Sequence, residues 1–286
     1  MKFYTYLLIV CCFMCFFEVQ AQNGWTRKAK GLYAQAAIST FSSNNYYNTD
    51  GELFNAGSTF QSRGLLLYGE YGLTDRFTAM LDLPLLMLNS FNTTETVAGI
   101  GNAKLGLKYR LLKNIPISLQ VDFEVPTDDG IKLSNAKEPN SLGMIDQINL
   151  PTSDGEFNVW TTLAASQSTS NGKTFGSVYT SLNLRTESFS NQLQVGLELG
   201  HLFFDKLYLI GKVKIQDKLS SDSGSPSASF LYGEGTTFTS YGLTTMYKLD
   251  KHLNLVASFS DFTDVIVKRR NIYDGTTFSV GVALEY

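Results

Sequence analysis

Cysteine is nearly absent from this 286-residue chain, and its placement limits what it can do. All three cysteines, Cys11, Cys12 and Cys15, lie within residues 1–21. If that stretch is removed during export, the mature chain has no thiol. A disulfide framework, a thiolate catalyst and a cysteine-ligated metal are then all excluded.

Residues 1–21 have the pattern of a secretory signal peptide. Lys2 supplies the positive start, the apolar run extends from Tyr4 to Phe17, and Val19-Gln20-Ala21 reads as a cleavage site. We therefore predict that the mature protein begins at Gln22. The alternative is an N-terminal membrane anchor, which the shortness of the apolar run disfavours.

Long apolar runs, histidine and excess positive charge are also scarce. After residue 21 no run of about 18 apolar residues occurs, which excludes transmembrane helices there. With only two histidines, and with no metal-ligand spacing or phosphate-binding loop, we predict no metal site, no cofactor and no catalytic residue. The net charge of -3 provides no basic face, so no nucleic-acid partner is expected.

What the sequence does contain is strict alternation, seen best from Gly101 to Val125. Every second residue is apolar on both sides of a turn, and the residues between them are polar or glycine. This pattern predicts two strands, each with one apolar and one polar face. A soluble sandwich would bury the apolar face in its core. A membrane barrel would turn it to lipid and turn the polar face to the lumen.

Strand length and connection length favour the barrel. A membrane strand needs about nine to eleven residues, whereas soluble strands average about five or six. Short turns alternate with longer polar connections, of which 127–155 is the longest and 218–236 is rich in serine and glycine. The other long connections are 42–59, 87–99 and 263–274. The twelve predicted strands are 30–41, 60–71, 76–86, 101–112, 116–126, 156–166, 174–185, 192–203, 206–217, 237–248, 252–262 and 275–286.

We therefore predict an all-β fold, a closed antiparallel up-and-down transmembrane β-barrel of about 12 strands over residues 22–286. An even number of strands lets the sheet close with antiparallel neighbours and leaves no edge that lipid could not satisfy. The predicted location is the outer membrane of a Gram-negative-type bacterium, with outer-membrane lipid around the barrel. Both termini are expected at the periplasmic end.

The chain stops in mid-strand on Tyr286, with Phe278, Val280, Val282 and Leu284 on the same face. Termini of soluble proteins usually fray, so such an ending is unusual for them. It resembles the C-terminal signal that the barrel-insertion machinery reads in outer-membrane proteins. That machinery is therefore an expected partner.

The segment Gly99-Ile100-Gly101-Asn102-Ala103-Lys104-Leu105-Gly106-Leu107-Lys108-Tyr109-Arg110-Leu111 resembles a recurrent strand of a family of outer-membrane transport barrels. That family is labelled by association with the meta-pathway of phenol degradation and is similar in appearance to fatty-acid and aromatic-hydrocarbon channels. Asp122-Phe123-Glu124-Val125-Pro126-Thr127 and the turn from Tyr71 to Phe77 are similar too. The resemblance implies a channel or transporter and supplies no catalytic residue. The fatty-acid channels also carry an N-terminal plug, for which the stretch between Ala21 and the first strand is too short.

Extending the alternation over all strands gives a set of candidate lumen-lining residues with nearly balanced charge. Folding the hairpins about their turns sets Lys104 opposite Glu124, and Glu198 opposite Lys212. Such pairs either fill and neutralise a narrow interior or line a polar channel that sorts solutes. In the second case Lys104, Lys108 and Arg110 form a basic ladder toward anionic solutes. The acids are Glu70, Asp82, Asp122, Glu124 and Glu198, and the bases are Lys104, Lys108, Arg110, Arg185, Lys212 and Lys214.

The predicted function is porin-like: passive passage of small solutes of unspecified kind through the barrel. Because broad general porins use 16 to 18 strands, about twelve strands leave a tighter bore. The alternative is a non-conducting barrel with a surface-binding or envelope-structural role. A lipid-hydrolysing enzyme would need a nucleophile beside a base. Neither His201 nor His252 has an adjacent serine on the same face, so we predict that the protein is not an enzyme.

Overall fold

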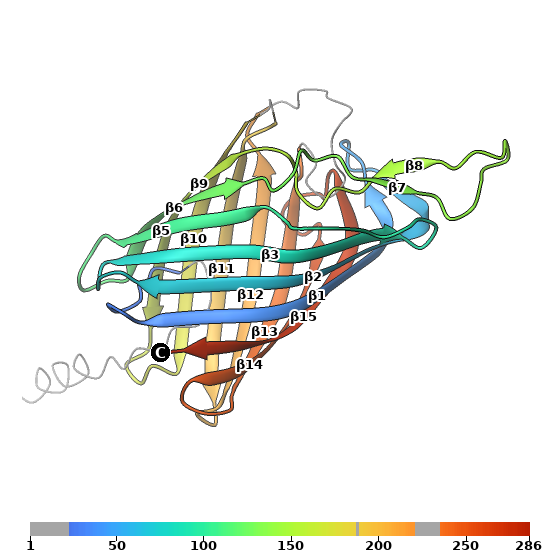
Figure 1. Cartoon of the computed structure of the whole chain (residues 1–286). Helices are drawn as coiled ribbons and strands as arrows, with labels where there is room; N and C mark the ends of the chain where they lie inside the picture. The colour runs from blue at the N-terminus through green and yellow to red at the C-terminus, as the bar shows by residue number, and fades with distance from the viewer. Residues whose placement is uncertain (1–22, 187–188, 221–234) are drawn as a thin grey trace, which may run out of the picture.

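The computed structural model describes residues 23–186, 189–220 and 235–286, which form one closed antiparallel sheet and the loops that join its strands (Figure 1). The predicted signal peptide, residues 1–21, lies outside the described residues. Within the described ranges, no helix has both the length and the apolar character needed to cross a bilayer.

Twelve long strands form the wall of the barrel, and three short strands lie in its loops. The short strands are β4 (Val97–Gly99), β7 (Leu133–Asn135) and β8 (Gln147–Asn149). The predicted closed barrel is confirmed. The wall consists of β1 (Leu32–Tyr47), β2 (Leu53–Gly72), β3 (Phe77–Phe91), β5 (Ala103–Arg110), β6 (Ile117–Val125), β9 (Asn158–Ser168), β10 (Thr174–Arg185), β11 (Gln192–Phe203), β12 (Leu207–Lys218), β13 (Phe238–Lys248), β14 (Leu253–Thr263) and β15 (Ile272–Glu285).

Closure of the ring joins the first and last strands. β1 pairs with β2 on one side and with β15 on the other, and β2 pairs with β3. Along each strand the exposure of the side chains alternates, as in β11, where buried and exposed residues follow one another over most of its length. The exposed set is apolar, with Leu105, Val178 and Leu199 each about half exposed. Closure thus leaves a polar inner face and an apolar outer face suited to lipid.

The wall is much taller on one side than on the other. β2 has 20 residues and β1 has 16, whereas β5 has 8. The sequence predicted loops at 42–59 and 87–99, but much of both is strand. Tyr46 pairs with Phe54 and Tyr273, so ladder hydrogen bonds and aromatic packing outweigh the weak strand preference of the serines and asparagines nearby.

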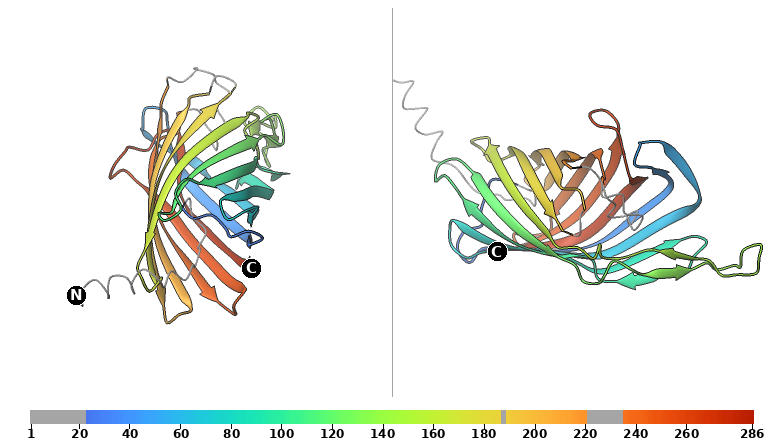
Figure 2. Two further views of the ribbon diagram at one scale, coloured as in Figure 1. Left: turned by 90° about the vertical axis from the view of Figure 1, so that its left-hand side faces the viewer. Right: turned by 90° about the horizontal axis from the view of Figure 1, so that it is seen from above.

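The longest loop, between β6 and β9, does two things. Its β7–β8 hairpin projects from the outer end of the barrel (Figures 1 and 2). Its final part, residues 150–156, turns inward, where the carbonyl of Pro151 accepts a hydrogen bond from Asn89 of β3 at 2.8 Å. Thr152 and Ser153 are fully buried. This segment covers the wall where β5 and β6 end early. Most of the serine-rich connection 218–236 lies outside the described residues.

Candidate functional site: the barrel interior

The structure places all eleven candidate lumen residues on the inner face of the wall. The strand registers and the alternation of burial put their side chains inside, together with the uncharged Gln35, Gln120 and Thr244. The charged residues are Glu70, Asp82, Lys104, Lys108, Arg110, Asp122, Glu124, Arg185, Glu198, Lys212 and Lys214.

Most of the inner charges are paired with a neighbour. The two cross-strand pairs expected from the register are present, with Lys104 Nζ 3.3 Å from Glu124 Oε2 and Lys212 Nζ 3.6 Å from Glu198 Oε1. Lys108 Nζ lies 3.7 Å from Glu70 Oε1. Two members of the predicted basic ladder, Lys104 and Lys108, therefore face carboxylates. The ladder is not a bare row of positive charge.

Four inner charges have a different environment. Asp82, Arg110 and Lys214 have no ion pair among the described residues, and Asp122 is bound to the Gln120 amide at 2.7 and 2.9 Å. Lys214 Nζ lies 5.2 Å from the centre of the Phe238 ring, a cation–π contact. These groups can therefore contact a solute without first breaking an ion pair.

A chamber lies at mid-height in the barrel. Its cavity has a volume of about 340 Å³ and is lined from nearly all sides, with Asp82 and Lys104 on one wall and Glu198 and Lys212 on another. Volumes of roughly 300–1,000 Å³ are typical of small-molecule sites. Met80, Met246 and Val256 also line the chamber, toward its periplasmic end. The chamber is therefore polar at its sides and apolar toward the periplasmic end.

The periplasmic end of the interior is filled by an apolar cluster. Its members are inner-face residues of β1, β10, β11, β12, β13, β14 and β15, with Tyr33 and Ile210 completely buried. Alternation alone assigned these strands a polar inner face. The sequence did carry a signal, because Leu207-Tyr208-Leu209-Ile210 is apolar on both faces. The cluster is Tyr33, Phe175, Leu202, Tyr208, Ile210, Met246, Val256 and Ala283.

The residues that precede β1 cross this same end of the barrel. We call residues 23–30 the N-terminal strap. Near its start the Ser166 hydroxyl of β9 accepts a hydrogen bond from Gly24 N, and the Trp25 ring meets the Phe175 ring of β10 edge-on at 5.9 Å. At its middle Arg27 is bound on the opposite side of the barrel. The sequence analysis found this stretch too short for a plug domain, yet it crosses the periplasmic end of the barrel interior as a single segment.

Arg27 is the main anchor of the strap. Its Nε lies 2.8 Å from Glu70 Oε2 on β2, and its Nη1 lies 2.7 Å from Glu285 Oε1 on β15. Its backbone N–H donates to the Thr78 hydroxyl on β3 at 2.8 Å. The guanidinium side chain is 6% exposed, so its bond to the buried Glu70 forms out of contact with bulk water, whereas Glu285 is 32% exposed. Sequence reasoning did not single out Arg27, since it lies outside any strand.

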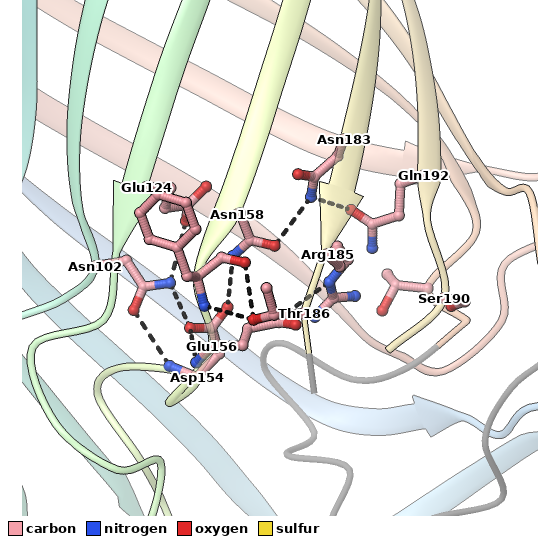
Figure 3. A network of polar contacts seen from close by, with 12 residues as sticks. Asn102, Glu124, Asp154, Glu156, Asn158, Asn183, Arg185, Thr186, Ser190 and Gln192 are labelled. Atoms are coloured by element: carbon pink, nitrogen blue, oxygen red, sulfur yellow. Dashed lines mark hydrogen bonds and ion pairs between the residues drawn. The ribbon is translucent and has the colours of Figure 1, made fainter. Parts of the chain in front are cut away.

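At the outer end a polar network ties the inward loop segment to the wall (Figure 3). The Asn102 amide donates to Asp154 at 2.6 Å and to Glu124 at 3.1 Å, and its carbonyl oxygen accepts from the Ser153 hydroxyl. Glu156 forms a buried ion pair with Arg185 of β10. The network fixes the loop as part of the inner wall.

Aromatic rings gather on the tall side of the outer end. Phe60 of β2 stacks on Tyr273 of β15 at 4.7 Å and meets Phe91 of β3 at 5.5 Å. Phe41 and Tyr46 of β1 pack against the same cluster. The interior therefore has an aromatic outer end, a charged middle and an apolar periplasmic end.

The two histidines lie near the periplasmic end and form local contacts. His201 faces outward and bonds through Nδ1 to the Thr174 hydroxyl at 2.7 Å. His252 lies at the periplasmic mouth, where its Nδ1 is 2.7 Å from the Glu285 carbonyl and its ring stacks on Tyr286. In the described part of the chain, no group of three or more potential ligands could hold a metal ion.

No protein-family model and no curated protein sequence matches this chain. Solved structures do share its fold. An outer membrane channel from Pseudomonas putida F1 is 14% identical, with a TM-score of 0.64 over 94% of this chain and 100% of that one. The translocator domain of the autotransporter NalP from Neisseria meningitidis is 13% identical, with a TM-score of 0.53 over 92% and 91%. The beta domain of the Bordetella autotransporter BrkA is 12% identical, with a TM-score of 0.51 over 91% and 100%. The chain therefore has the fold of an outer-membrane β-barrel, as its sequence predicts.

Proposed function

We propose that this outer-membrane barrel is a passive channel for small solutes. The charged chamber at mid-height carries the proposal. A barrel with only a structural role has no need of a cavity of about 340 Å³ lined by Asp82, Lys104, Glu198 and Lys212. Burying such groups is costly unless they are paired or hydrated, so the chamber is a place for water and polar solutes.

The size of the barrel limits what it passes. Twelve strands enclose a narrower interior than the 16 to 18 strands of broad porins. At the outer end residues 150–156 lie against the inside of the wall, and at the periplasmic end the strap crosses the interior. We infer that passage requires the strap to leave its site, and that the channel takes small solutes.

Conductance of the refolded full-length mature chain tests this proposal. In planar bilayers we expect discrete conductance steps, and a variant that lacks residues 23–30 should show larger or more frequent steps. Swelling of liposomes in solutes of graded size would then give the size limit. A barrel that is folded in detergent yet silent in both forms contradicts the proposal.

A non-conducting barrel is the second candidate, and the filled periplasmic end favours it. Tyr33, Tyr208 and Ile210 are 0 to 2% exposed there, and the buried members of the cluster all belong to wall strands, although Trp25 of the strap packs against them. If the variant without the strap remains silent, this apolar cluster is a permanent floor. The protein would then act through its outer surface.

A further inference from the structure

We propose that the chamber binds a small zwitterionic solute, with its cationic end at Asp82 and Asp122 and its anionic end at Lys214. The transport of such a solute rests on the proposed channel function, but its binding does not. The proposal stands on the separation of charge between two opposite walls of one chamber.

The two walls face each other across the lumen. In the ring of twelve wall strands, β3 and β12 are six positions apart, which places them on opposite sides. Asp82 of β3 and Lys212 of β12 line the same cavity. A second cavity of about 300 Å³ contains Lys214 and shares Glu198, Lys212 and Thr244 with the first. The two cavities therefore adjoin at these shared residues, and Lys214 lies beside the chamber.

Where β3, β5 and β6 line the first cavity, they contribute two carboxylates, Asp82 and Asp122, and one lysine, Lys104. Asp82 lies in register with Lys104, but Lys104 is already bound to Glu124 at 3.3 Å on the following strand. Asp122 lies above Gly106, where a Cβ atom would come within 2.0 Å of its Oδ1, so the missing side chain makes room for this carboxylate. Among the described residues, the nearby Lys104 and Lys108 form their ion pairs with Glu124 and Glu70, and neither Asp82 nor Asp122 forms one.

The wall formed by β11 and β12 offers a cation to the chamber. Lys212 is paired with Glu198, whereas Lys214 meets only the face of the Phe238 ring in the described part of the chain. Glu198 itself is incompletely satisfied. Its side chain is 7% exposed, and its Oε2 atom has no hydrogen-bond partner within the described ranges. A buried acceptor without a partner indicates a donor such as water in the chamber beside it.

This arrangement favours a solute that carries both signs. A simple anion that reaches Lys214 lies in a chamber that also holds Asp82 and Asp122, and a simple cation at these carboxylates gains nothing from Lys214. A molecule with an ammonium group at one end and a carboxylate at the other meets the opposite charge on both walls. Electrostatic complementarity of this kind gives specificity.

Calorimetric titration of the full-length mature protein in detergent tests the proposal with four compounds of equal chain length. These are 4-aminobutyrate, butyrate, butylamine and butyramide. Each of the other three compounds lacks at least one charge-assisted hydrogen bond, so we expect 4-aminobutyrate to bind about tenfold more tightly than each of them. Equal affinities for the four compounds, or no binding of 4-aminobutyrate, would overturn the proposal without any variant.

Variants locate the site. Lys214→Met and the double change Asp82→Asn with Asp122→Asn should each weaken 4-aminobutyrate binding about tenfold. Asp50→Asn and Lys113→Met change the same charges on exposed turns and should bind as the wild type does. If both chamber variants fold and bind normally, the solute is not held at these residues. Each variant is first checked for folding by its heat-dependent mobility on gels.

Swelling of liposomes separates this inference from the channel proposal. Binding of 4-aminobutyrate with no uptake would contradict the channel and leave the site in place. Equal uptake of all four compounds with no binding would leave the channel in place and contradict the site.

Discussion

Arg27 and Glu70 are joined by a hydrogen-bonded ion pair in which Nε lies 2.8 Å from Oε2, with both side chains buried inside the periplasmic end of the barrel. One partner belongs to the strap and the other to the wall. The strap is thus held by charge as well as by packing. Substitution of one partner of this buried ion pair should therefore weaken the attachment of the strap to the wall.

Replacement of Arg27 by Met should free the strap. The change removes the strap's ion pairs with Glu70 and Glu285, while Glu70 keeps Lys108 as a partner, so the barrel should still fold. We expect larger or more frequent conductance steps in planar bilayers than for the wild type. Lys113→Met, on an exposed turn, serves as the control. Identical traces for Arg27→Met and the wild type would show that the strap does not limit passage.

Removal of Lys104 should change ion selectivity. The inner charges are nearly balanced, so the wild type should show only weak preference in a KCl gradient. Lys104→Met leaves Glu124, 3.3 Å from the lysine in the wild type, without its partner. The reversal potential should then move toward cation selectivity, and Glu124→Gln should move it the other way. Strong anion selectivity of the wild type that survives Lys104→Met would instead support a ladder formed by Lys108 and Arg110.

Ile210 and Leu209 are adjacent on β12 but face opposite sides of the wall. Ile210 is completely buried in the apolar cluster, whereas Leu209 faces outward. Ile210→Ala should lower the free energy of unfolding by about 2–5 kcal/mol, because it leaves a cavity in close-packed surroundings. Leu209→Ala should cost less, since lipid or detergent can fill the space. Urea unfolding in lipid vesicles measures both, and equal losses would argue against a packed floor.

The folded conformation of the outer loop after β14 should lose stability at low pH. Asp264 accepts hydrogen bonds from Arg269 at 3.0 Å through each carboxylate oxygen, and these bonds lower the pKa of Asp264 below its usual value. Because the unfolded-state pKa is near 3.9, the ionised group favours the folded loop above about pH 3.9. That contribution is lost as the pH falls through the lowered folded-state pKa.

Carbon-13 NMR of the Asp264 carboxyl in micelles measures this pKa directly. Arg269→Lys removes the planar fork that bonds both oxygens, so the pKa of Asp264 should rise toward its usual value. A wild-type pKa at or above that value would show that the loop is not held by this pair.

Alternation predicted the barrel because lipid outside and water inside impose it on every strand. The same rule placed Lys104 opposite Glu124, since hairpin turns fix the register. It could not predict the inward segment 150–156, which has no period and is held by distant residues such as Asn89. It also missed Ile210 and Met246, because a rule that assigns one face to polar residues does not anticipate an apolar filling at one end.

The 20-residue span of β2 has a consequence for how the molecule meets its surroundings. At about 3.3 Å per residue and a tilt near 45°, such a strand rises roughly 45 Å, whereas the apolar band of an outer-membrane barrel is about 25 Å tall. The wall on the β2 side of the barrel therefore extends beyond the lipid surface. The exposed Leu53 and Phe54 at the start of β2 therefore lie on the part of the wall that rises above the lipid, beside the projecting β7–β8 hairpin.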